Sequence, residues 1–136
     1  KKASAAITVT VAPAVNSVTV SPSTASILPG GSKQLTAAVD AVGGAATTVT
    51  WSSSDASNKV AVDNTGKVTV AANAAPGSYT ITATSTADAT KKASAAITVT
   101  VAPAVNSVTV SPSTASILPG GSKQLTAAVD VVGGAA

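Results

Sequence analysis

The stretch Val49-Thr50-Trp51-Ser52-Ser53-Ser54-Asp55 decides the fold of this chain. It holds the only tryptophan among 136 residues, and the chain has no phenylalanine or methionine to fill a core beside it. The residues before this stretch occur twice in the chain, whereas the stretch itself occurs once. It therefore marks the middle of a folding unit, and the repeated flanks mark where such units begin and end.

The flanking sequence repeats with a period of 90 residues, because residues 1–46 recur as residues 91–136 with one change, Ala41 against Val131. Solenoid repeats are shorter, at about 20–50 residues, so this period suits a tandem array of small domains. The near-identity indicates a recent duplication and predicts a parent chain with further copies. The alternative is an engineered or misassembled chain.

Strand patterns run along the whole sequence. Apolar residues make up 45% of the chain, mostly Val, Ala and Ile, and the polar residues are largely Thr and Ser. This β-branched composition favours strands, and apolar residues alternate with polar ones in segments separated by Gly and Pro every 8–12 residues or so. We therefore predict an all-β fold with two packed sheets, a β-sandwich, with a barrel as the alternative. The expected strands cover residues 1–11, 17–21, 25–29, 34–42 and 93–101, with shorter ones around Trp51, Val60, Val68 and Ile81.

Alternation also predicts which side chains face the core and where the chain turns. The turns are expected at Gly30 and Gly31, and at Asp63 to Gly66, where Asp, Asn and Gly match hairpin chemistry. The expected core residues are Leu35, Val39, Trp51, Val62, Val68, Tyr79, Ile81, Ile97 and Val99.

Five short motifs follow one another in order along the chain. They are Ser17-Val18-Thr19-Val20-Ser21-Pro22, Gly30-Gly31 ahead of Gln34-Leu35-Thr36, Thr50-Trp51-Ser52-Ser53-Ser54, Val62-Asp63-Asn64-Thr65-Gly66-Lys67-Val68, and Tyr79-Thr80-Ile81-Thr82-Ala83. This ordered series resembles the bacterial immunoglobulin-like domain, group 2, over residues 17–101. The resemblance implies an immunoglobulin-like sandwich with Trp51 on its third strand, packed against Leu35, Ile81 and Ile97.

The resemblance also divides the chain. Residues 1–11 are expected to be the last strand of a preceding repeat, residues 12–16 a linker, and residues 17–101 one complete domain. Residues 102–105 form a second linker, and residues 106–136 supply the first strands of a following repeat. This last segment cannot close a sandwich alone, so we expect neighbouring repeats or identical chains as its partners, by domain swapping between chains.

Chemical activity is not expected. There is no histidine to act as a base for the many serines, so we predict that the chain is not an enzyme and needs no cofactor. A weak Ca²⁺ site is the alternative, because carboxylate and amide oxygens suit that ion. Its candidate ligands are Asp55, Asp63, Asn64 and Asp88, which form no compact calcium-loop motif.

The charge and hydropathy of the chain exclude other classes of partner. The net charge is only +3 and is scattered, unlike the clustered basic patch of a nucleic-acid binder. No apolar run is long enough to span a membrane, so no membrane insertion is expected. There is no cysteine and therefore no disulfide framework.

The expected function is architectural. The resemblance implies a module of bacterial surface proteins, adhesins, phage virions or secreted enzymes. We expect an extracellular or cell-surface repeat that builds an elongated stalk or filament. The alternatives are a cell-adhesion module that binds a surface receptor or glycan, and an accessory domain of a secreted or phage enzyme.

Overall fold

The computed structural model of the chain describes residues 1–133. The chain forms two compact units, residues 1–99 and residues 100–136, which are described separately below. The last three residues of the predicted following repeat lie outside the described residues. No helix occurs within residues 1–133, and accordingly none there could cross a membrane.

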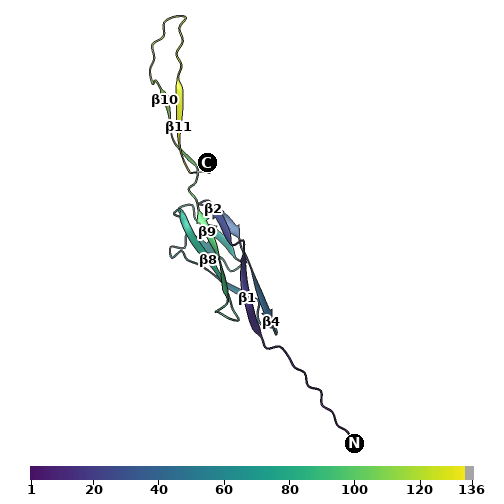
Figure 1. Cartoon of the computed structure of the whole chain (residues 1–136). Coiled ribbons are helices and arrows are strands. Elements are labelled where there is room, and N and C mark those ends of the chain that lie inside the picture. Colours follow the sequence, from purple (N-terminus) through teal and green to yellow (C-terminus); the bar gives the residue numbers. More distant parts are fainter. Residues whose placement is uncertain (134–136) are drawn as a thin grey trace. The chain divides into compact units, whose positions relative to one another are not determined.

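The first unit contains nine strands in two layers (Figure 1). The predicted all-β sandwich of two sheets is therefore confirmed. The strands are β1 (Ala14–Ser21), β2 (Thr24–Ile27), β3 (Ser32–Gln34), β4 (Thr36–Val42), β5 (Val49–Ser53), β6 (Val60–Val62), β7 (Lys67–Val70), β8 (Gly77–Ser85) and β9 (Lys92–Val99).

One layer is a four-stranded sheet in the order β2-β9-β8-β5. The last strand, β9, lies between β2 and β8, parallel to the former and antiparallel to the latter. On the other side of β8 lies β5, with Trp51 opposite Ala83. Because β9 pairs on both sides, its removal would separate β2 from the rest of the sheet.

The other layer consists of a three-stranded sheet, β3-β7-β6, and the pair β1-β4. Strands β3 and β4 follow each other directly, with only Leu35 between them, but they pair with different neighbours. The Leu35 amide leaves the ladder and donates to the Gly66 carbonyl oxygen at 2.9 Å. The single strand predicted over residues 34–42 is therefore wrong, because the backbone changes partner at Leu35.

The first strand of the sandwich crosses between the layers. Its first part, β1, pairs with β4 in one layer, and its second part, β2, pairs with β9 in the other. Pro22 lies between the two parts and has no amide hydrogen to donate to a ladder, so pairing stops there. This crossing places both layers in contact with one short N-terminal segment, residues 14–43.

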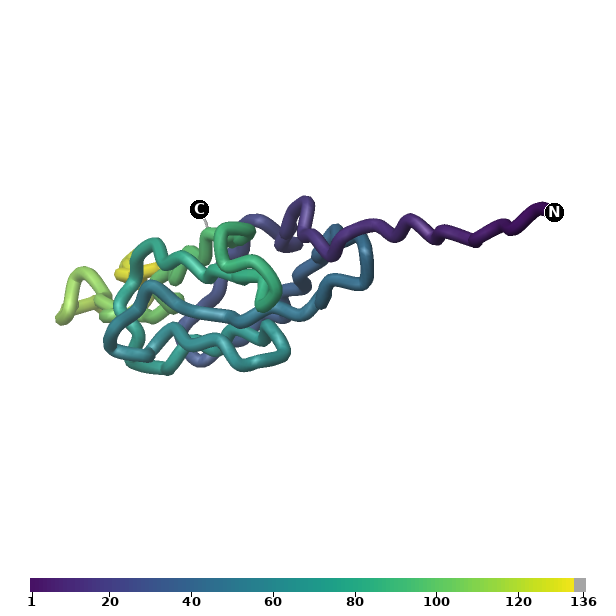
Figure 2. Tube along the Cα trace, turned by 90° about the horizontal axis from the view of Figure 1, so that it is seen from below, coloured from purple at the N-terminus to yellow at the C-terminus, as the bar shows by residue number. Residues whose placement is uncertain are grey.

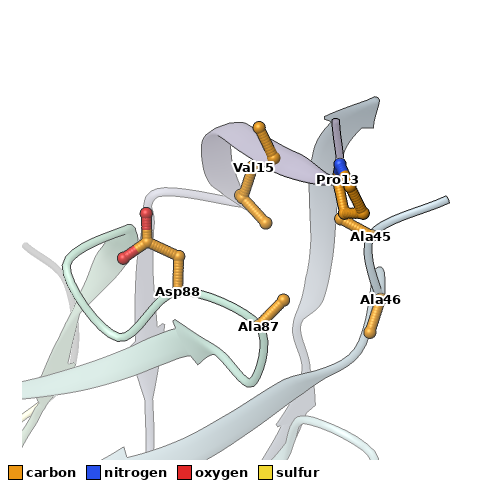
Figure 3. A pocket seen from close by; sticks show the side chains of 7 residues that line it. Pro13, Val15, Ala45, Ala46, Ala87 and Asp88 are labelled. Carbon is orange, nitrogen blue, oxygen red and sulfur yellow. The ribbon is translucent and has the colours of Figure 1, made fainter. Parts of the chain in front are cut away.

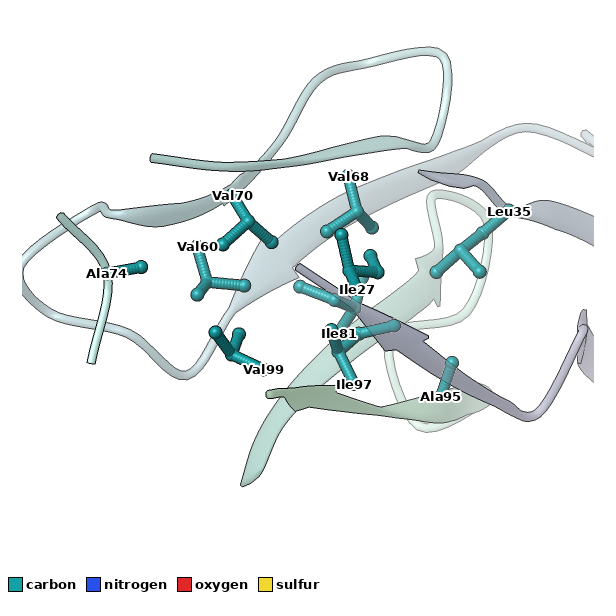
Figure 4. Packing of buried hydrophobic residues seen from close by; sticks show 10 residues of the cluster. All are labelled: Ile27, Leu35, Val60, Val68, Val70, Ala74, Ile81, Ala95, Ile97 and Val99. Atoms are coloured by element: carbon teal, nitrogen blue, oxygen red, sulfur yellow. The ribbon is translucent and has the colours of Figure 1, made fainter. Parts of the chain in front are cut away.

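The core fills the space between the layers (Figure 4). Five of the predicted core residues are buried, namely Leu35, Val68, Ile81, Ile97 and Val99, whereas Val39, Trp51, Val62 and Tyr79 are half-buried. The main cluster also contains residues that our core prediction lacked, which are Ile27, Val60, Val70, Ala74 and Ala95. A second, smaller cluster consists of Val15, Val18 and Ala83, and Trp51 packs against both clusters.

The predicted domain limits need correction. Strand β1 begins at Ala14, inside the predicted linker of residues 12–16, and β9 ends at Val99 rather than at Val101. The sandwich therefore extends over residues 14–99. The predicted linker is too long because Ala14 and Val15, directly after Pro13, already pair with Val42 and Ala41 as the first residues of β1.

Residues 1–11 form no strand, although their alternation predicts one. Figure 2 shows the N-terminal segment as an extended trace leading away from the sandwich. The reason lies in pairing, because the identical residues 91–101 already occupy the place between β2 and β8. Without two such neighbours, the side chains of Ile7 and Val9 stay exposed, whereas those of Ile97 and Val99 are buried.

The second unit is an antiparallel hairpin of two strands, β10 (Ala104–Ser111) and β11 (Thr126–Val132). Every residue of both strands is exposed. Since β10 begins at Ala104, the second predicted linker, residues 102–105, is also too long. The hairpin contains the second copy of the sequence that forms β1 to β4 in the sandwich.

Candidate functional site

The 90-residue repeat places nearly the same sequence in two surroundings. Residues 14–43 are part of the sandwich, whereas residues 104–133 belong to the second unit. The hairpin β10-β11 has the same register as β1-β4, and both contain a bulge at the same place, after Val15 and after Val105. The same side-chain bonds recur. Asn16 donates to Asp40 at 3.1 Å, and Asn106 donates to Asp130 at 3.2 Å. The internal structure of this hairpin therefore does not require the rest of the sandwich.

Two strands of the first copy have no counterpart in the second. Residues 114–117 and 122–124, which correspond to β2 and β3, form no strand. In the sandwich, β2 pairs with β9 and β3 pairs with β7, and both partners belong to residues 47–99. Strands thus form in the second copy only where the partner lies within the copy itself. The first copy pairs with strands of residues 47–99, whereas residues 104–133 pair only within themselves in the described part of the chain.

The two copies also differ in the exposure of corresponding side chains. Apolar residues that are buried in the first copy are about half exposed or more in the second. The four clearest pairs, with their exposed fractions, are Val15 and Val105 (7% and 62%), Val18 and Val108 (8% and 63%), Ile27 and Ile117 (6% and 55%), and Leu35 and Leu125 (0% and 48%). We call the set Val105, Val108, Ile117 and Leu125 the open half-core. Sequence reasoning predicted an incomplete segment here, and comparison of the two copies identifies its side chains.

The candidate calcium ligands lie on separate turns. Asp55, in the loop after β5, accepts four hydrogen bonds: from the Ser57 amide at 2.9 Å and hydroxyl at 2.6 Å, and from the Lys59 and Val60 amides at 2.8 Å each. These bonds fix the loop between β5 and β6. Both oxygens of this carboxylate are therefore engaged by its own loop.

Asp63 and Asp88 accept hydrogen bonds within two other turns, each through one carboxylate oxygen. Asp63 accepts from the amide and hydroxyl of Thr65, at 2.8 and 2.6 Å, and from the Lys67 amide at 3.0 Å. Asp88 accepts from the amide and hydroxyl of Thr90, at 3.0 and 2.6 Å. The predicted turn from Asp63 to Gly66 is present between β6 and β7, closed by a bond from the Gly66 amide to the Asp63 carbonyl oxygen at 3.1 Å.

These hydrogen bonds favour the charged carboxylates. The hydroxyl of Ser57, followed by the Val60 amide, lowers the pKa of Asp55 from its ordinary 3.8 to about 2. The hydroxyl of Thr65 lowers the pKa of Asp63, and the hydroxyl of Thr90 lowers the pKa of Asp88. Each carboxylate acts as a turn-stabilising acceptor, a role that Asp followed two residues later by Ser or Thr performs at all three sites.

The four candidate ligands do not converge. No group of three or more acidic, histidine or cysteine side chains comes together within the described part of the chain. Asn64 lies in the β6–β7 turn beside Asp63, away from the loops that contain Asp55 and Asp88. In this arrangement each of the three carboxylates stabilises its own turn.

The aromatic side chains serve the core. Tyr79, on β8, is half-buried, and its hydroxyl donates to the Ala75 carbonyl oxygen at 2.9 Å. Trp51 is half-buried and packs against both apolar clusters. A shallow groove beside it is lined by its own ring, by Leu35, and by threonines and Asn64. Neither ring stands clear of the surface in the way expected of a stacking platform for a ligand.

A second hollow lies beside the start of β1 (Figure 3). Six of its seven lining residues are apolar, and the seventh is Asp88, one of whose carboxylate oxygens accepts hydrogen bonds from Thr90. Its lining residues are Pro13, Ala14, Val15, Ala45, Ala46, Ala87 and Asp88.

The predicted glycine turns are present. Gly31 follows β2, and its amide donates to the Leu28 carbonyl oxygen at 2.9 Å. Gly30 has a φ of +83° and open space where a side chain would begin. Gly120 and Gly121 repeat this turn in the second unit, with the Gly121 amide donating to Leu118 at 2.9 Å. This turn, like the hairpin, is encoded locally.

Comparison with known families gives a match over the sandwich. The family model for the bacterial Ig-like domain (group 2) matches residues 14–97, which begin at the first residue of β1 and end within β9. The match covers more than half of the chain and coincides with the sandwich. The resemblance predicted from the sequence motifs is confirmed. No curated protein matches the chain.

Proposed function

We infer that this chain, which belongs to the family of bacterial Ig-like domains (group 2), is a structural module that builds an elongated stalk or filament. Domains of this family are non-catalytic and occur in bacterial surface and extracellular proteins. The stalk is our proposal. The single observation that carries it is the placement of the two ends of the sandwich.

Those two ends lie far apart. Strand β2 runs parallel to β9 and ends opposite it, with Ile27 facing Val99. Since β1 precedes β2 in the same direction, β1 starts at one end of the sandwich and β9 stops at the other (Figure 1). Successive repeats that enter at one end and leave at the other would extend in a line.

The connection between repeats is short. Only residues 100–103 separate the end of β9 from the start of β10. This connection has the sequence Thr-Val-Ala-Pro and ends at Pro103. A connection of four residues contains little slack.

 A short segment with a proline is semi-rigid, so neighbouring sandwiches would keep a nearly constant orientation. A body whose longest strand has nine residues is roughly 30–40 Å long with its turns and connection. Each added repeat should lengthen the stalk by about that amount.

Exchange between chains is the second part of the proposal. The open half-core is exposed in the second unit, and its sequence is that of a segment buried in the first. A neighbouring repeat of the same protein, or an identical chain, would supply residues like 47–99 to cover it. Either partner turns the incomplete copy into a further sandwich of the same stalk.

The stalk can be tested on chains that contain two and four copies of residues 14–103 in tandem, with one copy as the control. Small-angle scattering should show a maximum dimension that grows by roughly 30–40 Å for each added copy. A four-copy chain whose maximum dimension matches that of a compact globule of the same mass would contradict the proposed stalk.

A further inference from the structure

We propose that the sandwich is a load-bearing element, in which the ladder between β2 and β9 resists tension applied through the two ends of the sandwich. We call this ladder, residues 24–27 against residues 96–99, the β2–β9 ladder. Its role deepens the proposed stalk and rests on it, because a stalk that holds something away from a surface transmits force through each repeat in turn. Strand direction, strand pairing and side-chain burial each support it.

Tension along the chain acts on opposite ends of two parallel strands. It enters through Pro13 at the start of β1 and passes along β1 into β2, whereas it leaves through Thr100 after the end of β9 (Figure 1). Because β2 and β9 are parallel, β2 is drawn toward its own start and β9 toward its own end. The two strands are therefore pulled in opposite directions along their shared axis, which loads the hydrogen bonds between them in shear.

Shear makes the bonds of the β2–β9 ladder share the load. The bonds of a parallel ladder are evenly spaced, and this ladder has four residue pairs. It is preceded by a bond from the Ala96 amide to the Ser23 carbonyl oxygen at 2.9 Å. A displacement of β2 along β9 must stretch all of these bonds together, whereas a force that opened the ladder from one end would break them one after another.

The β2–β9 ladder is the direct connection between the two loaded segments. Strand β1 pairs with β4, and β9 pairs on its other side with β8, so both of these ladders join a loaded strand to one that is not itself pulled. Among the strands of residues 14–99, only β2 and β9 are both loaded and paired with each other. With four pairs, this ladder is also shorter than the seven pairs of β1–β4 and the eight of β8–β9. It must fail before the N-terminal segment and the last strand can separate.

Failure of this ladder would also open the core. Ile27 on β2 and its ladder partner Val99 are 6% and 2% exposed, and Ile97, opposite Ala25, is fully buried. The side chains of Ile27, Ile97 and Val99 belong to the main apolar cluster between the layers (Figure 4). Sliding β2 along β9 would expose them to water, which is unfavourable, at the same time as it stretches the bonds. Burial and hydrogen bonding therefore resist the same displacement.

The direction of pulling tests this role without altering the ladder. The chain has no cysteine, so two introduced cysteines can attach the full chain to the handles of an optical trap. Ala12→Cys with Val101→Cys, both at exposed positions, applies tension along the chain and loads the ladder in shear. Ala12→Cys with Ala89→Cys is the matched control. Ala89 is exposed in the loop before β9, and its neighbour Asp88 lines a hollow together with Pro13, so both handles lie at the end where β1 starts (Figure 3).

We expect the sandwich to unfold along the first direction at a force at least about twice that of the second. The reason is that the evenly spaced bonds of the ladder break together in the first direction and singly in the second. The introduced cysteines replace exposed side chains, so the two variants should have the same stability in urea. Equal forces in the two directions, or a lower force along the chain, would overturn the proposal.

Proline substitutions identify the ladder itself. Bonding residues recur at every second position of a strand in a parallel ladder, and Ser23 bonds to β9, so the amide of Ala25 faces β9 and that of Ser26 faces away. Ala25→Pro should lower the force along the chain by roughly a quarter, the share of one bond in so short a ladder, and leave the force in the second direction unchanged. Ser26→Pro, on the outer side of an edge strand where proline is tolerated, should change neither force.

An equal fractional loss of force in both directions on Ala25→Pro would overturn the assignment to β2 and β9. If Ala25→Pro fails to fold, the two pulling directions of the chain with an intact ladder still decide. These force measurements need only one sandwich, whereas the stalk is tested by scattering from tandem copies. Failure of the load-bearing role is therefore distinguishable from failure of the proposed stalk.

Discussion

Gly66 lies directly against Trp51 in the sandwich. A Cβ atom on Gly66 would lie 2.7 Å from the indole Cζ2 atom of Trp51 and 2.6 Å from the carbonyl oxygen of Leu35. The turn from Asp63 to Gly66 thus closes over the tryptophan, and the Gly66 carbonyl accepts the Leu35 amide at the point where the chain changes sheets. One glycine connects the tight turn, the central aromatic ring and the break between β3 and β4.

Gly66→Ala should therefore destabilise the sandwich strongly. Gly66 has a φ of +88°, and the added methyl group would also have to displace the indole or the backbone. We expect a loss of roughly 2–4 kcal/mol in the free energy of unfolding, from the left-handed backbone and the overpacking together. Urea unfolding followed by the fluorescence of Trp51 measures this loss.

Gly30→Ala is the matched control, since Gly30 has a similar φ of +83° but nothing within 4 Å of its Cβ position. Its expected cost is only about 1 kcal/mol. Equal costs for the two variants would show that contact with Trp51 contributes nothing.

Asp55 predicts how stability depends on pH. Its pKa in the folded chain is about 2, below its ordinary value of 3.8, because the Ser57 hydroxyl and the amides of its loop favour the carboxylate. Because this pKa is lowered on folding, the Asp55 carboxylate stabilises the folded chain fully above about pH 4. This stabilisation is lost as the pH falls toward about 2. Urea unfolding at several pH values should show stability declining across this window.

Asp55→Ala should flatten that decline and lower the stability at neutral pH, because four hydrogen bonds of the loop are lost. Asp63 and Asp88 also have lowered pKa values, so part of the decline should persist. A variant whose pH profile matches that of the unaltered chain would refute this role for Asp55.

Calcium should have no effect on the sandwich. Asp55, Asp63 and Asp88 each accept hydrogen bonds within their own turns, and they lie on separate loops. We expect the same melting temperature in excess chelator and in millimolar Ca²⁺. A reproducible rise in melting temperature with Ca²⁺, abolished by Asp63→Asn, would instead indicate a calcium site.

The sequence predicted the sandwich and much of its core because alternation reports which face of a strand is buried. It could not predict that β4 and β3 separate at Leu35, since a change of pairing partner leaves the alternation intact. Val62 and Val60 share one face of β6, but Val60 is fully buried and Val62 is only half-buried. Which of the two is covered depends on neighbours distant in sequence.

The repeated segments show that sequence alone cannot tell which of two identical copies forms a strand. Residues 1–11 and 91–101 have identical sequences, yet only the second copy contains a strand. No local property can distinguish identical sequences, so the difference lies wholly in the partners available. The motifs indicated that segments were incomplete, but only the paired strands identify Leu125 and Ile117 as the exposed counterparts of buried residues.

Truncation should expose this dependence on partners. Removing residues 100–136 deletes only the second unit, so the melting temperature of the sandwich should not change. Removing residues 92–136 deletes β9 as well, which pairs with both β2 and β8 and carries Ile97 and Val99 into the core. This shorter chain should be unfolded at μM concentrations, as judged by circular dichroism and Trp51 fluorescence.

The shorter chain still contains residues 2–9, whose sequence is identical to that of residues 92–99. They cannot restore the missing strand within their own chain, because the five steps from Val9 to Ala14 span at most about 18 Å and the strand must end at the far end of the sandwich. Residues 2–9 of another chain can do so, which makes refolding concentration-dependent. Refolding that is independent of concentration would mean that residues 2–9 do reach the site, and would refute the opposite placement of the two ends on which the stalk depends.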